Sequence, residues 1–196
     1  MSAGLLRQQD FGFYEKRQGS DPKFHGRIVK TLQEGIKQSP INKEMTLFRT
    51  MALSDFSGIL GDELTQQHVG KFLQPKGFTS TATEPAVAMR GWGGSEDQVL
   101  MQIQASPGTK AIPIGAAPSF NETEMLLGHK QQYQLKNIEH FRPEELRHLV
   151  EYNGQNILTD QVTEDDYKRI KACVTLIPVG DIDKLTDKDI IPTYQR

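Results

Sequence analysis

Three short segments of the chain carry side chains that can do chemistry together. Arg49 follows an aliphatic and an aromatic residue, and a guanidinium suits anionic groups. Ser80 and Thr81 lie in a run that is typical of a strand, where a hydroxyl can hold a carboxylate. Glu122 and Glu124 stand two positions apart, so on a strand both carboxylates can converge on one site. Taken singly, each segment also fits a surface arginine, an exposed strand face or solvated acids.

Other familiar catalytic or ligand-binding patterns are absent from the sequence. The chain has no P-loop, no GxGxxG sequence after a strand and no GxSxG sequence. Cys173 lies in an apolar segment, where a cysteine usually packs as a small apolar residue. Five histidines show no metal-binding spacing, and we interpret them as surface or core residues: His25, His68, His129, His140 and His148. We therefore expect no metal site.

The composition indicates a soluble globular domain. The chain has 196 residues, 23 basic and 25 acidic side chains, and a formal net charge of −2. No apolar run approaches the roughly 20 residues of a membrane span, and a single cysteine excludes an intrachain disulfide. The charge balance argues against a large nucleic-acid surface. We expect one domain over residues 1–196, with residues 1–20 loosely ordered.

The N-terminal half is expected to alternate helices and strands. A helix follows Asp21-Pro22 and ends at Ser39-Pro40, because a proline disfavours helical geometry in the residue before it. Four of its apolar residues share one face: Ile28, Val29, Leu32 and Ile36. The pattern then predicts strands at 45–49 and 78–81, a helical stretch at 54–73 and a short helix at 84–89.

The C-terminal half is expected to be richer in strands. Residues 99–105 and 110–114 read as two strands joined by the tight turn 106–109, which predicts a hairpin. Further strands are predicted at 123–127, 131–138 and 172–178. Pro143 and Thr163 each open a helix, the first with acids in its first turn and the second with a capping-box pattern. Short strands with few helices between them indicate the α+β class.

In order and spacing, the three segments resemble the arginine–serine–glutamate class of bacterial mono-ADP-ribosyltransferase toxins. The resemblance covers residues 45–135: Leu-Phe-Arg, Lys-Gly-Phe-Thr-Ser-Thr, the Pro-Gly-Thr-Lys turn and Glu-x-Glu before aliphatic residues. It implies two small antiparallel sheets packed together, with flanking helices and an NAD cleft. It also implies cleavage of the nicotinamide–ribose bond of NAD and transfer of ADP-ribose to a protein.

The resemblance assigns the two glutamates distinct roles. Glu124 matches the carboxylate that stabilises positive charge developing on the ribose and accepts a hydrogen bond from its 2′-hydroxyl. Glu122 would orient the acceptor and help remove its proton. In the family, a glutamate at this position goes with an arginine acceptor, which needs a base because a guanidinium is otherwise protonated.

The resemblance also implies residues that bind NAD and the target. Arg49 would grip the pyrophosphate, and Ser80 would hold Glu124 in place with support from Thr81. Four further residues have implied roles: the backbone at Thr50 around the nicotinamide, Arg90 as a second phosphate contact, Trp92 as a lid or as packing for its loop, and Phe120 as a target contact or a local core residue.

Two positions depart from the family pattern. The family usually has glycine where this chain has Thr50, and serine where it has Ala82. A binding module that has lost catalysis is therefore one alternative, and an NAD glycohydrolase without a protein acceptor is another. Residues 138–170 match nothing in the family, and we expect target-specific surface there.

The resemblance further implies how the protein works in the cell. NAD is the expected co-substrate, with no metal, and the partner is a protein target such as actin or a GTPase. The first 22 residues lack the apolar stretch of a secretory signal, which favours an effector or toxin component delivered into the cytosol of a target cell. We expect a monomer.

Overall fold

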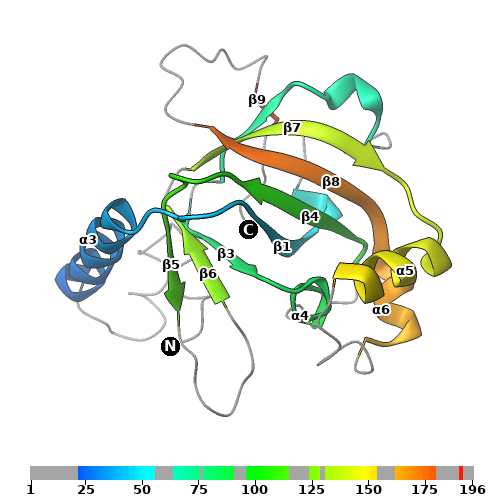
Figure 1. Ribbon diagram of the computed structural model, residues 1–196, viewed down its shortest axis with the longest axis horizontal. Helices are drawn as coiled ribbons and strands as arrows, with labels where there is room; N and C mark the ends of the chain where they lie inside the picture. Colours follow the sequence, from blue (N-terminus) through cyan, green and yellow to red (C-terminus); the bar gives the residue numbers. More distant parts are fainter. Residues whose placement is uncertain are drawn as a thin grey trace.

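The computed structural model describes residues 22–55, 64–75, 77–90, 96–114, 124–128, 131–153, 162–179 and 190–191. Its strands form one curved sheet, with helices gathered at two sides (Figure 1). Within these described residues, no helix is both long and apolar enough to cross a membrane.

In the part of the chain that the structure describes, nine strands make the sheet, in the order β5-β6-β3-β1-β4-β8-β7-β2-β9. Their bounds are β1 Met45–Ala52, β2 Phe72–Leu73, β3 Thr79–Ala82, β4 Gln98–Ala105, β5 Ala111–Ile114, β6 Glu124–Leu127, β7 Gln132–Glu139, β8 Ile170–Val179 and β9 Ile190–Ile191. The helices are α3 Pro22–Gln38, α4 Pro85–Arg90, α5 Pro143–Asn153 and α6 Glu164–Arg169. The α+β class is confirmed.

The sheet consists of two parts that meet at a narrow junction. A part formed by β5, β6 and β3 joins the other strands through β1. In the described residues, β1 and β3 are in register at the single pair Phe48 and Ala82. The expected two small sheets are therefore linked into one. They are not wholly antiparallel either, since β4 runs parallel to β8 and β2 parallel to β9. These parallel pairs form between segments far apart in the chain, which short-range patterns cannot reveal.

The predicted hairpin at 106–109 is wrong, although the turn itself is present. The amide of Thr109 donates to the carbonyl of Ser106 over 3.0 Å, and Gly108 has a φ of +95°, which glycine adopts without steric cost. Ile41 also forms two backbone hydrogen bonds with this turn. Its carbonyl accepts from the amide of Gly108, and its amide donates to the carbonyl of Thr109, both at a distance of 2.8 Å. The flanking strands do not pair with each other: β4 pairs with β1 and β8, while β5 pairs with β6.

The helical stretch expected at 54–73 is also wrong where the structure describes it. Short 3-10 turns occupy η1 Leu53–Asp55 and η3 Gln66–His68, and Phe72–Leu73 is a strand that pairs with β7. Gly70 has a φ of +92°, and its amide donates to the carbonyl of Leu135 over 2.8 Å. Pairing with β7 thus overrides the weak helical pattern, because tertiary contacts outweigh small propensity differences.

Three apolar clusters hold the elements together. The largest lies between the two parts of the sheet and includes Leu47, Met101, Leu127 and Leu176. A second joins β1, β3, β4 and β8 to α4, α5 and α6, and a third packs α3 against β3, β5 and β6. Figure 1 shows α3 at one side of the sheet and α5 and α6 at the other.

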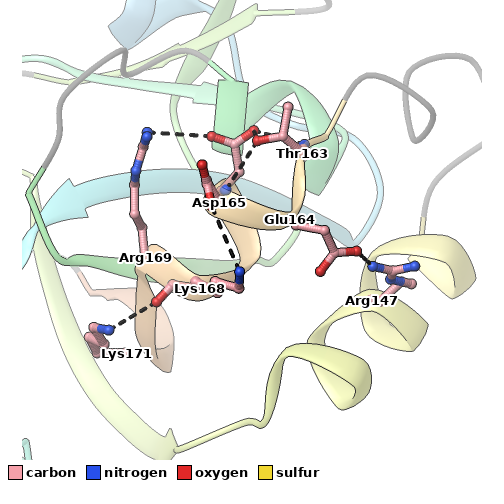
Figure 2. Close-up of polar contacts among 8 residues, drawn as sticks. Arg147, Thr163, Glu164, Asp165, Lys168, Arg169 and Lys171 are labelled. Atoms are coloured by element: carbon pink, nitrogen blue, oxygen red, sulfur yellow. Dashed lines mark hydrogen bonds and ion pairs between the residues drawn. The ribbon is translucent and has the colours of Figure 1, made fainter.

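Helices α5 and α6 pack together as a small helical unit (Figure 2). Thr163 caps α6: its hydroxyl accepts from the amide of Asp166 over 3.3 Å, and the Asp166 carboxylate accepts from the Thr163 amide over 2.9 Å. Arg147 of α5 forms an ion pair with Glu164 of α6. The Arg147 guanidinium also lies over the ring of Tyr167, 5.3 Å from its centroid. Tyr167 is buried in the second apolar cluster, so these contacts join α5 to α6 above that cluster.

Cys173 should resist thiol reagents in the folded protein. It is 2% exposed in β8, and burial raises the pKa of its thiol to about 12. Because the thiolate is the reactive form, we expect Ellman's reagent to modify the thiol only after unfolding in denaturant. Rapid modification of the native protein would show that this strand is accessible.

Candidate active site

The hydroxyl of Ser80 donates a hydrogen bond to the carboxylate of Glu124. These residues lie on the adjacent antiparallel strands β3 and β6, where Ser80 is opposite Leu126 and Glu124 is opposite Ala82. Ser80 and Glu124 are therefore diagonal neighbours on one face, a spacing that a glutamate side chain can bridge. The bond holds the half-buried carboxylate against the strand.

This pair lies on the sheet face opposite the largest core, at the meeting point of the other two apolar clusters. By alternation, Ser80 shares its face with Ala82 of β3 and with Phe78, the residue just before the strand. Phe78 packs with Ile36 of α3, whereas Ala82 packs in the cluster that contains α4. A polar pair is thus set between two apolar clusters, with α3 and α4 on either side of it.

Thr81 strengthens the pairing of the two strands. It points to the opposite face from Ser80, where its hydroxyl donates to the carbonyl of Met125 over 2.7 Å. Ser80 and Thr81 are 6% and 3% exposed, so neither hydroxyl lies on the open strand face that composition alone allows. The rigid strand pair fixes the backbone from which Glu124 projects.

Thr50 connects the neighbouring strand to α4. Its hydroxyl donates to the carbonyl of Ala88 over 2.8 Å, and the residue is 1% exposed. Two residues further on, α4 ends at Arg90, whose side chain is exposed. Sequence reasoning considered only the backbone of Thr50 and missed this link, because no local pattern relates residues 38 positions apart.

Arg49 does not share the face of Glu124. Phe48 is paired with Ala82, which is paired with Glu124, so the next residue of β1 points to the other side of the sheet. There Arg49 is opposite the buried Met101 and is 9% exposed. The structure therefore brings Ser80 and Glu124 together but leaves Arg49 on the core side of β1.

A buried tyrosine near Arg49 was not anticipated from the sequence. Tyr133 of β7 is fully buried in the largest core. Burial raises the pKa of its hydroxyl well above the ordinary value, and the neighbouring Thr79 side chain and the positive charge of Arg49 oppose this rise. Arg49, Thr79 and Tyr133 thus form a polar group inside the core. The alternating pattern of β7 predicts that Tyr133 is inward, but not what it faces.

Several expected site residues lie outside the described residues: Glu122, Trp92 and Phe120, with the loops at 91–95 and 115–121. Across the part of the chain that the structure describes, no group of three or more acidic, histidine or cysteine side chains could hold a metal ion.

Replacing Ser80 by alanine should lower turnover. The variant removes the hydrogen bond that holds the Glu124 carboxylate, and a misplacement of about 1 Å in a catalytic group can cost on the order of a hundredfold. We expect kcat to fall about tenfold to a hundredfold, measured as nicotinamide release, with a nearly unchanged KM for NAD. Ser54→Ala is the matched control, since Ser54 donates to the Glu96 carboxylate over 3.3 Å at the surface. Equal turnover in both variants would contradict the positioning role.

A family model for the ADP-ribosyltransferase exoenzyme matches residues 6–165, and this range contains the Ser80–Glu124 pair. The chain belongs to this family. The family is one of transferases, since the exoenzyme that its model describes transfers ADP-ribose. No curated protein matches the chain in sequence.

Solved structures of ADP-ribosylating toxins share the fold. Plx2a, an ADP-ribosyltransferase toxin from Paenibacillus larvae, has a TM-score of 0.57 and 15% identity, covering 90% of this chain and 78% of its own. BECa of a C. perfringens binary enterotoxin, solved with NADH, has a TM-score of 0.56 and 15% identity over 83% of this chain. This chain spans only 37% of BECa. C3stau2 from S. aureus, solved with NAD, has a TM-score of 0.52 and 14% identity, covering 79% of this chain and 71% of its own.

Proposed function

We propose that the protein is an NAD-dependent mono-ADP-ribosyltransferase that modifies an arginine side chain of a target protein and releases nicotinamide. The observation that carries this proposal is the hydrogen bond from Ser80 to Glu124 on paired strands of an ADP-ribosyltransferase exoenzyme domain. NAD as co-substrate is supported by the structural relatives BECa and C3stau2, which were solved with NADH and NAD.

The proposed reaction uses Glu124 at the sugar. The bond between the ribose C1′ and the nicotinamide nitrogen breaks, and nicotinamide leaves with the bonding electrons. Positive charge then develops on the ribose, and a nearby carboxylate stabilises it. Because Ser80 already holds the carboxylate on one side, Glu124 needs little rearrangement when this charge appears.

The acceptor side is assigned to Glu122. A nitrogen of the target arginine forms the new bond to C1′ and loses a proton, which Glu122 accepts. An arginine is protonated at ordinary pH, so this step requires a base. Glu122 stands two residues before Glu124 in the sequence, which supports convergence of the two carboxylates if the strand continues through both.

Other residues are proposed to bind NAD and the target. The ribose is proposed to lie at Glu124, and Arg49 is proposed to bind the pyrophosphate. This role requires the guanidinium to become accessible, because Arg49 is 9% exposed on the core side of β1. Arg90 is exposed at the end of α4 and is the proposed second phosphate contact. Trp92 is proposed to cover the nicotinamide, and Phe120 to contact the target.

We also propose the setting in which this activity operates. The protein is a single catalytic domain, and residues 138–170 supply surface that is specific to its target. It acts as a monomeric effector or toxin component in the cytosol of a cell into which it is delivered. Actin or a GTPase is a suitable class of target.

Labelled NAD incubated with a cell lysate tests the proposal directly. Wild type and Glu124→Gln are compared, and the labelled protein is treated with neutral hydroxylamine, which releases ADP-ribose from arginine. A band made only by the wild type and removed by hydroxylamine supports the proposal. A stable band contradicts the arginine acceptor, release of nicotinamide without a band favours a glycohydrolase, and the absence of both signals favours a binding module.

A further inference from the structure

Helix α4 is too short to be stable by itself. It has six residues, and an isolated helix of this length does not form in water. Its inner side packs in the second apolar cluster, where Ala86 and Met89 meet Leu146 and Val150 of α5. Figure 1 shows α4 between the end of β3 and the α5–α6 unit. The position of α4 is therefore set by what surrounds it.

Thr50 supplies the donor that the end of α4 lacks. The last carbonyls of a helix have no partner within it, and Ala88 belongs to this last turn. Ala88 is 8% exposed, so its carbonyl has little access to water, and the buried Thr50 hydroxyl donates to it over 2.8 Å. A glycine, which the resembling family usually has at this position, cannot make this bond.

We propose that Thr50 is a positioning residue that holds the last turn of α4, and through it the exposed Arg90, in place for NAD. Arg90 is two residues beyond the bonded carbonyl and lies at the end of the helix. A shift of this turn moves the base of the Arg90 side chain. This inference rests on the proposed function, because it assigns Arg90 an NAD phosphate.

The variant Thr50→Val keeps the shape of the side chain and removes the donor. Because a buried acceptor is then left unpaired, the last turn of α4 loosens. We expect the amides of α4 to exchange faster with deuterium. We also expect the KM for NAD to rise about threefold to tenfold, because a displaced Arg90 loses part of the binding energy of its hydrogen bond to the NAD phosphate. Nicotinamide release gives the kinetics, and kcat should change less than KM. Thr50→Ser, which keeps the donor, should restore both exchange and KM.

Two further variants separate positioning from a general loss of structure. Ser39→Ala removes a hydroxyl-to-carbonyl bond of 2.9 Å, from Ser39 to Gly35, and should leave the exchange of α4 and the KM unchanged. In an Arg90→Ala background, Thr50→Val should no longer raise the KM, since the residue through which it acts is gone. Thr50→Ala replaces Thr50→Val in every comparison if the valine variant does not fold.

Each result decides between the alternatives. Faster exchange in α4 with a raised KM that serine rescues supports the proposal. Unchanged exchange overturns the link between Thr50 and α4, and faster exchange with an unchanged KM overturns the positioning role. An equal KM effect with and without Arg90 overturns the route through Arg90. If wild type neither consumes nor binds NAD, the proposed function and the positioning role both fail, while exchange still decides whether Thr50 holds α4.

Discussion

Glu124→Gln should abolish both transfer of ADP-ribose and hydrolysis of NAD. The amide has nearly the shape of the carboxylate and can still accept a hydrogen bond from Ser80, but it carries no charge to stabilise the cationic ribose. Removal of a group that stabilises transition-state charge costs on the order of a hundredfold to a thousandfold in kcat, and the central carboxylate should lie at or above this range. Nicotinamide release and label transfer measure the two reactions separately.

The matched control is Glu139→Gln, at the exposed end of β7. It removes the same charge and should leave both reactions at the wild-type rate, with a thermal midpoint equal to that of Glu124→Gln. If Glu124→Gln keeps more than about a tenth of the wild-type rate of NAD hydrolysis, the assignment of this residue is wrong, because removal of the charge that stabilises the ribose should lower the rate further.

Glu122→Gln should separate the two reactions. The variant lacks the base that takes the proton of the arginine, and general base catalysis contributes about a hundredfold to ten-thousandfold. We therefore expect transfer to arginine to fall by at least a hundredfold, while hydrolysis of NAD stays within about threefold of wild type, because water needs less assistance than a guanidinium. Both rates are measured in one assay with labelled NAD and the target protein.

Hydrolysis is the internal control in this experiment, since it reports that NAD still binds and that Glu124 still acts. An equal loss of both reactions would place Glu122 at the sugar and not at the acceptor. Unchanged transfer would remove the chemical basis for an arginine acceptor and direct the search to other side chains.

The family could be recognised from the sequence because the residues expected to carry its chemistry lie in short segments. Leu-Phe-Arg, Thr-Ser-Thr and Glu-x-Glu each lie within a few residues, and they follow one another in a fixed order. The ends of helices could also be predicted where they depend on neighbouring residues in the sequence. Pro22 and Pro40 bracket α3, and the Thr163–Asp166 capping box opens α6 as expected.

Predictions that depended on distant partners were less successful. The turn at 106–109 is present, but a turn specifies a reversal of the chain and not the strands that will pair, so the expected hairpin did not follow. The stretch at 66–73 has only a weak helical periodicity, and Phe72–Leu73 pairs with β7 as a strand. Both errors arose because the energy of a strand comes from its neighbours in the sheet.

By itself, the sequence determined which residue types are available for the reaction and in which order they occur, because these are properties of the chain alone. Only the tertiary structure decided which of them meet. The register of β3 and β6 sets Ser80 diagonal to Glu124, and the junction of β1 with β3 turns Arg49 to the other face. The same packing joins Thr50 to Ala88. A shift of one residue in a strand exchanges its two faces, so such contacts depend on long-range pairing that no local pattern contains.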